Sequence, residues 1–244
     1  MTIEWIAPDW RAPANVRALS TWRTGGVSAG AYASLNLGDH VGDSPAAVAQ
    51  NRRLLREAAR LPADPPWLRQ VHGSRVADLD SGELPREADA AVARRPGRIC
   101  AILSADCLPV LFAEERGGAV GAAHAGWRGL AAGVLEAAVR ALAVPPSRLL
   151  AWIGPGIGAE HYEVGAQVRD AFLAADPAAA AAFRPNGRGR YLADLAWAAR
   201  RRLAALGVER IHRTADCTYA DANRYFSYRR EGCCGRQATL IWLA

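Results

Sequence analysis

The sequence predicts an α/β or α+β protein in which strands and helices share a mixed β-sheet. Three observations support this class. Strand-like and helix-like segments intermingle along the whole chain. Of the 244 residues, 51% are hydrophobic, so one large core can form without disulfides or a structural metal. We find no linker and no internal repeat, and we therefore expect residues 1–244 to form a single domain.

The N-terminal third contains strand-like and helix-like patterns in turn. Residues 16–22 form an apolar run that predicts a strand before a glycine-rich turn. A helix is predicted to begin after Ser44, which can cap it, and to end at Leu61. Pro45 occupies the first helical position, where its missing N–H costs nothing. Short strands are predicted at residues 75–79 and 88–93.

The most apolar stretch covers residues 99–112. It is too short to cross a membrane and too continuous for a half-exposed strand. We expect a buried strand that breaks between Asp106 and Pro109, because proline cannot donate to a central ladder. A second buried strand is predicted at residues 119–125. An amphipathic helix should follow, with Leu130, Val134, Ala138 and Leu142 on one face.

The C-terminal part continues the alternation of strands and helices. A strand at residues 149–153 precedes the glycine-rich segment GPGIG. Two further amphipathic helices are predicted at 164–175 and 192–206, and Gly207 suits the C-terminus of the second one. Strands at 208–213 and 238–243 complete the predicted elements.

Composition and charge exclude several classes of protein. The net charge is +6, but the basic residues are scattered, so we expect no nucleic-acid partner. No window is apolar and long enough for a membrane helix, and the N-terminus does not resemble a signal peptide. Five irregularly spaced cysteines argue against a disulfide framework. We therefore expect a cytoplasmic protein without membrane partners.

All 30 basic residues are arginine. The lack of lysine excludes a Schiff-base lysine, a pyridoxal-phosphate lysine and the lysine of a phosphate-binding P-loop. Any bound anion must therefore be held by arginine side chains or by backbone N–H groups.

Three possible metal ligands lie beside strand ends and glycine-rich turns: His72 in QVHGS, Cys107 in SADCLP and His124 in AAHAGWRG. Their spacing matches no short zinc finger, so spacing alone leaves a metal site and ordinary core residues as alternatives. The context of His124 favours a site. It ends a very apolar strand and precedes a helix entrance, and a buried imidazole there needs a partner.

Several segments together resemble the YfiH-type family, catalogued as laccase-domain or polyphenol-oxidase proteins and as purine nucleoside phosphorylases. They are QVHGSRV, ADCLPVLF, HAGWRG, GPGIGAEHYEV and YFSYRREGCCGRQATLIWL. The resemblance extends from about Trp22 to the last residue. It implies an α/β/β/α layered arrangement and one zinc ion bound by His72, Cys107 and His124.

Two imidazoles and one thiolate suit Zn²⁺, and three protein ligands leave a fourth position open. An open position indicates catalysis, so we expect His72, Cys107 and His124 to be catalytic as well as metal-binding. A multicopper oxidase needs many more histidines, largely in His-x-His pairs, than the five found here. We therefore expect a single zinc ion and no multicopper centre.

The activity that the resemblance implies is phosphorolysis of adenosine, inosine and S-methyl-5′-thioadenosine, together with deamination of adenosine. The partners would then be purine nucleosides and inorganic phosphate. Three alternatives stay open: a hydrolase that edits peptidoglycan precursors, a metal-free hydrolase in which His124 activates Cys107, and a metal-binding regulator without turnover.

Arginines in the resembling segments are candidates for the anion. Arg23 precedes a Thr-Gly-Gly turn that could cradle phosphate, and Arg229 lies in Phe-Ser-Tyr-Arg, so we expect both to bind phosphate. For Arg52 and Arg128, a functional role and a solvated surface position are equally compatible with the sequence.

Other polar residues carry weaker expectations. Asp106 could act as a general base only if the chain break turns its side chain toward the pocket. Tyr162, after the GPGIG turn, could line the pocket, as could His161. His40 and His212 are expected to be structural.

Overall fold

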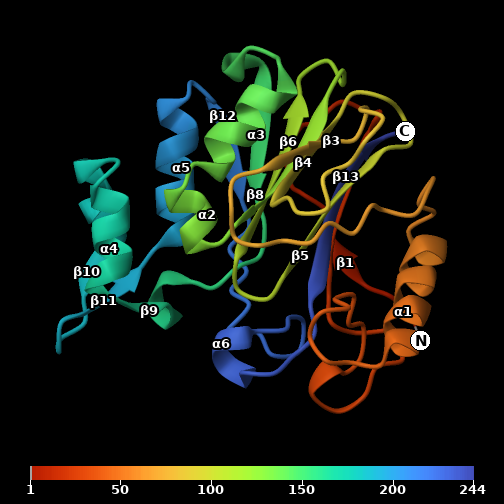
Figure 1. The fold of residues 1–244 in the computed structure, drawn as a ribbon, viewed down its shortest axis with the longest axis horizontal. Coiled ribbons are helices and arrows are strands. Elements are labelled where there is room, and N and C mark those ends of the chain that lie inside the picture. Colours follow the sequence, from red (N-terminus) through yellow and green to blue (C-terminus); the bar gives the residue numbers. More distant parts are fainter. Residues whose placement is uncertain (1) are drawn as a thin grey trace.

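The computed structural model describes residues 2–244, and two stacked β-sheets form its centre (Figure 1). The first sheet has the order β1 (Trp5–Ile6), β2 (Val16–Thr21), β13 (Gln237–Leu243) and β5 (Ile99–Ser104), all antiparallel. The second has the order β12 (Arg210–Arg213), β8 (Leu149–Ile153), β6 (Leu108–Glu114), β7 (Val120–Ala125), β4 (Ala90–Ala93) and β3 (Val76–Asp78). Its two outer pairs are parallel and its inner pairs antiparallel, so it is a mixed sheet.

Helices and a small third sheet surround these two sheets. The helices are α1 (Pro45–Ala58), α2 (Trp127–Ala131), α3 (Val134–Leu142), α4 (Ala166–Leu173), α5 (Leu195–Ala205) and α6 (Tyr228–Glu231). Short 3₁₀ helices cover Gly30–Tyr32, Pro146–Arg148, Ala159–His161 and Pro177–Ala182. The third sheet has the order β10 (Phe183–Pro185), β11 (Arg190–Ala193) and β9 (Glu163–Gly165).

Strand β6 shows how the layers are held together. Val110 and Phe112 face the core under the helices, whereas Leu111 and Ala113 face the core between the two sheets. Because both faces of the strand are buried, its sequence is continuously apolar and does not alternate.

Helices close the stack on both sides. Helices α3 and α5 pack on the six-stranded sheet, and α1 packs through Leu55 on the four-stranded sheet (Figure 1). The predicted α/β class and the α/β/β/α arrangement are confirmed.

The apolar stretch at residues 99–112 is two strands in different sheets. Its first part, β5, belongs to the four-stranded sheet, and its second part, β6, to the six-stranded sheet. The chain crosses at residues 105–107, within the predicted break. Pro109 lies inside β6, just before the pairing of β6 with β8 begins at Val110. The crossing leaves Cys107 in a connecting loop at the end of the layer between the sheets.

The predicted helices are shorter or divided in the structure. The helix after Gly126 is interrupted at Gly133, whose φ of 89° is left-handed, so α2 and α3 are separate. All four predicted face residues are nevertheless fully buried. The helices expected at 164–175 and 192–206 begin later than predicted, because β9 and β11 occupy their first residues.

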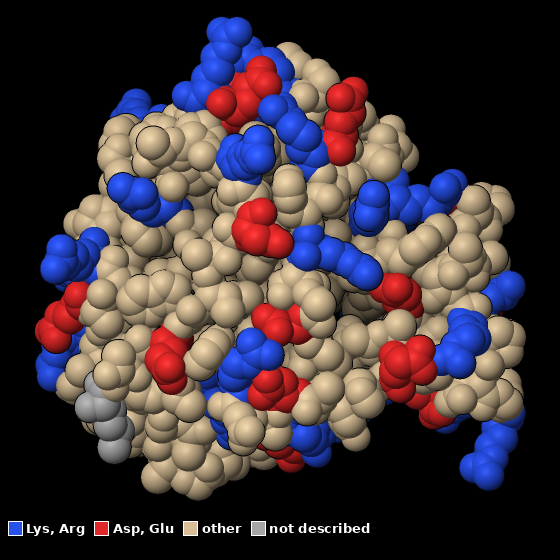
Figure 2. Space-filling model, turned by 180° about the vertical axis from the view of Figure 1, so that it is seen from behind, with Lys and Arg blue, Asp and Glu red and all other residues tan. Residues whose placement is uncertain are grey.

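Charged side chains of both signs intermix on the face shown in Figure 2, and the arginines do not gather there into one large patch. Several arginines are neutralised locally, as in the pairs Arg202–Glu136 at 2.7 Å and Arg94–Asp78 at 2.9 Å. Within residues 2–244, no helix is both long and apolar enough to span a membrane.

The core between the sheets predicts a large loss of stability on truncation. Leu111 is fully buried in that core. Leu111→Ala should lower the free energy of unfolding by about 2–5 kcal/mol, because a cavity replaces the lost methyl contacts. Leu84 is 44% exposed and provides a matched control, since Leu84→Ala should change the stability little. Urea titration followed by circular dichroism measures both, and similar losses would contradict the assignment.

Candidate metal centre and its pocket

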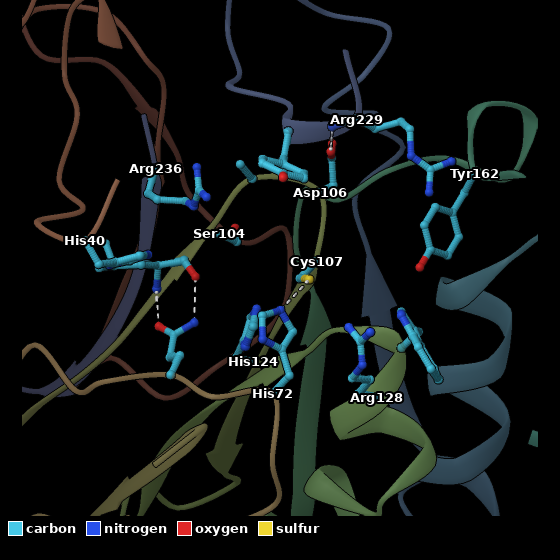
Figure 3. Close-up of a pocket in the computed structure, with 15 residues that line it drawn as sticks. His40, His72, Ser104, Asp106, Cys107, His124, Arg128, Tyr162, Arg229 and Arg236 are labelled. Atoms are coloured by element: carbon cyan, nitrogen blue, oxygen red, sulfur yellow. Dashed lines mark hydrogen bonds between the residues drawn. The ribbon is translucent and has the colours of Figure 1, made fainter. Parts of the chain in front are cut away.

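The three predicted ligands meet at one point of the structure (Figure 3). His72 lies in the loop before β3, Cys107 in the loop between β5 and β6, and His124 in β7. Their ligand atoms all lie within 4.8 Å of one another, and Cys107 Sγ is 3.8 Å from His72 Nε2. Residues from three separate segments therefore converge on a space suited to one metal ion.

A buried carboxylate positions two of these ligands. Asp89 is fully buried, and its Oδ1 lies 2.9 Å from His124 Nδ1. The same carboxylate accepts backbone N–H bonds from Val71, His72 and Gly73 at 2.8–3.1 Å. Asp89 therefore fixes the His72 loop and occupies His124 Nδ1, so that Nε2 is the nitrogen of His124 directed toward the other two candidate ligands.

The close approach of Cys107, His72, His124 and Asp89 shifts the pKa values of several of these groups. Burial would raise the pKa of Cys107, but His124 and His72 outweigh burial and lower it to about 6. Burial would lower the pKa of His124, but Cys107 and Asp89 raise it to about 9. Burial would raise the pKa of Asp89, but the hydrogen bonds from His124 and the backbone hold it below its usual value. Cys107 is thus favoured as a thiolate, the form in which cysteine binds metals.

Two glycines allow the ligand segments to approach each other. A Cβ at Gly126 would lie 2.7 Å from Cys107 Sγ and 3.0 Å from His72 Cδ2. A Cβ at Gly129 would lie 2.9 Å from the carbonyl oxygen of Gly73. The glycines of the segment HAGWRG therefore make room for the ligands and for the His72 loop.

The three ligands line a cavity of about 510 Å³. Figure 3 shows Arg128, Tyr162 and Arg229 on one side of the ligands, with His40, Ser104 and Arg236 on the other. The ligand cluster lies between these two ends. A substrate in the cavity can therefore contact the cluster and both ends.

The arginine end provides positive charge in an aromatic setting. The Arg229 guanidinium lies 5.0 Å from the centre of the Tyr162 ring and donates to the carbonyl oxygen of Glu163. Arg128 lies 4.6 Å from the Trp127 ring. Among residues 2–244, no carboxylate pairs with Arg128 or Arg229, so both cations are available to an anion in the pocket.

The structure does not bring Arg23 into this pocket. The Arg23 guanidinium pairs with Glu231 at 2.6 Å and lies 4.4 Å from the Phe226 ring. It also donates to backbone carbonyls, including that of Ala33 at 3.1 Å. Arg52 is likewise engaged, by the carbonyl oxygen of Leu37. Of the four arginines singled out from the sequence, the pocket thus contains Arg128 and Arg229.

Asp106 lines the pocket, and each of its carboxylate oxygens accepts a hydrogen bond from the protein. Its φ of 91° turns the side chain so that Oδ1 accepts from Thr218 and Oδ2 from the Arg229 backbone N–H, both at 2.7 Å. Asp106 thus ties the Cys107 loop to helix α6 and positions Arg229. These contacts indicate a structural role for Asp106 and do not favour its use as a general base.

The remaining polar residues divide between the pocket and its surroundings. Tyr162 lines the cavity as expected, whereas His161 stacks on Tyr219 at 4.6 Å outside it. His40, for which a structural role was expected, also lines the cavity.

Sequence reasoning missed Asp89 and Ser104. Both had a signal in the sequence, because each interrupts an otherwise apolar strand-like run with a polar residue that needs a partner.

The donor set fits one transition-metal ion. Cys107 is favoured as a thiolate, the two imidazoles lie beside it, and the Asp89 contact with Nδ1 orients the His124 ring. Among residues 2–244, this is the group of three or more potential ligands that could hold a metal ion. Fold and site together define an α/β/β/α protein in which a group of three potential metal ligands lines a pocket.

The comparison with known proteins places this chain in a family. A family model described as multi-copper polyphenol oxidoreductase laccase matches residues 17–244. A purine nucleoside phosphorylase of Pseudomonas aeruginosa is 53% identical, and the purine nucleoside phosphorylase YfiH of Escherichia coli is 51% identical, each over 98% of both chains. The chain therefore belongs to this laccase-domain family, and its resemblance to the YfiH-type proteins is confirmed.

Solved structures agree with this assignment. A Neisseria meningitidis protein superimposes with a TM-score of 0.94 at 48% identity over 98% of both chains. YlmD from Geobacillus stearothermophilus superimposes with a TM-score of 0.86 at 31% identity, over 98% of this chain and 96% of YlmD.

The Asp89 contacts predict a specific loss of metal affinity. In Asp89→Asn, an amide NH₂ replaces one accepting oxygen and faces N–H donors, so the His72 loop and His124 lose their common support. Metal affinity should fall about 10–100-fold. Asp78→Asn is the control, because Asp78 is partly exposed and pairs with Arg94 away from the pocket. Competition with a chromogenic chelator measures both variants, and unchanged affinity in Asp89→Asn would refute the positioning role.

Proposed function

We propose that this protein is a purine nucleoside phosphorylase that acts on adenosine, inosine and S-methyl-5′-thioadenosine and also deaminates adenosine. The names of the relatives support the first activity. The observation that carries the proposal is the pocket itself. Arg128, Arg229 and Arg236 line it without a carboxylate partner in residues 2–244, beside the group of three potential metal ligands.

Phosphorolysis needs an anion beside the sugar. A phosphate oxygen attacks C1′ of the ribose, the bond from C1′ to the purine nitrogen breaks, and the purine leaves with the electron pair and takes up a proton. The products are ribose 1-phosphate and the free base. Arg128 and Arg229 supply the charge that holds phosphate in this position. Arg23 contributes indirectly, because its pair with Glu231 holds helix α6, which carries Arg229.

Tyr162 provides a neutral donor at the same end of the pocket. Its ring is buried, its hydroxyl points into the cavity (Figure 3), and burial raises its pKa, which keeps the phenol protonated. We assign Tyr162 to a hydrogen bond with phosphate or with the ribose.

His72, Cys107 and His124 would hold one zinc ion. When bound, zinc supplies a Lewis acid and a positive charge that polarise an oxygen atom in the pocket. Asp89 maintains the ligand geometry, and Gly126 leaves the space for it. Deamination uses water in place of phosphate and releases ammonia, so it needs the same metal group and none of the arginine charge.

The family description mentions several coppers, and we propose one zinc ion instead. The whole chain has five histidines, and the three-ligand group uses two of them. The remaining His40, His161 and His212 are too few to build the blue and trinuclear copper sites of a multicopper oxidase. All five cysteines are free thiols, which agrees with the cytoplasmic location that we propose.

The zinc assignment predicts the metal content. The purified protein should carry about one zinc ion per chain, and His72→Ala, Cys107→Ala and His124→Ala should each lose it, because two donors do not retain the ion. Elemental analysis measures this, with Cys100→Ala as a control for a buried cysteine outside the pocket. Stoichiometric copper with an intense blue absorption would contradict the assignment. Full activity after complete metal removal would favour a metal-free thiol hydrolase instead.

The proposed role of the two arginines in phosphate binding predicts that their variants lose phosphorolysis much more than deamination. Arg229→Ala and Arg128→Ala should each weaken phosphate use about ten- to a hundred-fold, since a charge-assisted hydrogen bond contributes about 1.5–3 kcal/mol. Adenosine deamination should change little, and Cys107→Ala should remove both activities. Steady-state kinetics with varied phosphate test this.

Arg201→Ala is the control, because Arg201 pairs with Asp176 outside the pocket. Arg23→Ala should show a smaller phosphate defect than Arg229→Ala. Equal losses of both reactions in the two pocket arginine variants would rule out the phosphate role.

A further inference from the structure

Ser104 is a buried polar residue without a partner in the wall of the pocket. It is the last residue of β5, is 2% exposed and lines the cavity beside the ligand cluster (Figure 3). No hydrogen bond satisfies its Oγ among residues 2–244. A hydroxyl buried in this way is costly unless a bound molecule satisfies it.

The pattern of β5 makes the serine conspicuous. Alternate residues Cys100 and Ile102 face the core between the two sheets. Ser104 is the next residue of this series, at the point where the core ends and the pocket begins. An apolar side chain here would extend the core without burying an unpaired hydroxyl. A serine at this position therefore favours a hydrogen bond with a molecule bound in the cavity.

Two neighbouring polar side chains at this end already have hydrogen-bond partners. The Gln70 amide exchanges two hydrogen bonds with the backbone of Leu103, at 2.7 and 2.8 Å. Arg236 Nη1 donates to the carbonyl oxygens of Cys234 and Gly235, both at 2.9 Å. Ser104 therefore has a buried, neutral hydroxyl without a partner at this end, which it shares with Arg236 and His40, whereas Arg128 and Arg229 lie at the opposite end.

We propose that the Ser104 hydroxyl binds the 6-substituent of the purine base. This inference rests on the proposed function, which assigns phosphate to the arginine end. With phosphate there and the ribose next to it, the base extends toward Ser104 and its C6 edge lies near the ligand cluster. That orientation also suits deamination at C6.

The chemistry of a hydroxyl gives this contact a consequence for specificity. A serine hydroxyl donates to a 6-oxo group and, after rotation, accepts from a 6-amino group. One residue therefore serves inosine and adenosine alike, whereas a carboxylate or an arginine would select one of them. Ser104 thus allows the pocket to accept either an oxo or an amino substituent at C6 of the purine.

The test compares two ribosides that differ along the C6–N1 edge of the base. Inosine carries an oxo group there, and 6-methylpurine riboside carries a methyl group that neither donates nor accepts. Calorimetry on the zinc-loaded protein without phosphate measures both affinities. Ser104→Ala should weaken inosine binding about three- to ten-fold, as expected for one neutral hydrogen bond, and should leave 6-methylpurine riboside within two-fold. The kcat/KM for adenosine should fall by a similar factor.

Controls separate recognition from a structural role. Ser104→Ala should retain zinc and its thermal midpoint, because the hydroxyl has no partner in the fold. Ser147→Ala, at an exposed position outside the pocket, should bind both ligands like the wild type. Equal losses for both ligands, no loss for inosine, or loss of zinc or of fold in Ser104→Ala would each overturn the proposal.

The wild-type protein distinguishes this inference from the proposed function. If it binds inosine with the Ser104 dependence described but consumes no phosphate, the phosphorylase proposal fails and the role of Ser104 in base recognition stands. If it binds no purine nucleoside, both fail.

Discussion

The carboxylate of Asp89 is the contact on which the candidate site depends. It is fully buried, and its burial is tolerable because four N–H groups surround it, three from the His72 loop and one from His124. A loop that lacks regular structure of its own is thereby fixed to β4 and β7. The backbone strain of His72, with a φ of 61°, is maintained by the same contacts.

The crossing between the two sheets is the second determinant of the site. Residues 105–107 carry the chain from β5 to β6, and Asp106 anchors this short loop to Thr218 and to helix α6. The loop therefore presents Cys107 on one side and supports Arg229 on the other. A single tight connection thus couples the metal ligands to the anion end of the pocket.

Much of the fold and the site followed from the sequence. Strand 149–153 and the helix after Ser44 were predicted closely, because strong apolar patterns and a cap mark them. The three candidate ligands, which the structure brings together, were identified by their residue types and by family resemblance. The small sheet of β9, β10 and β11 was missed because its strands are short and partly exposed and carry no alternating pattern.

The sequence did not predict which arginines lie in the pocket, and the reason is different from that for the small sheet. Arg23 and Arg229 lie in equally suggestive segments, yet Glu231 engages Arg23 outside the pocket. That pair joins residues 208 positions apart, so the sequence around Arg23 gives no indication of it. The same limit applies to Asp89 and Ser104, since a polar residue in an apolar run signals a partner without saying which one.

The connectivity of the sheets also bears on how the site comes into being. Strand β13 inserts between β2 and β5, so the Ser20 and Thr239 hydroxyls meet across 219 positions of the chain. Contacts of such long range are slow to form, because much chain entropy is lost before they stabilise the fold. The three candidate ligands come from segments far apart in the chain, so their arrangement depends on the completed tertiary fold. A metal ion that binds at this place would therefore meet a site that folding has already assembled.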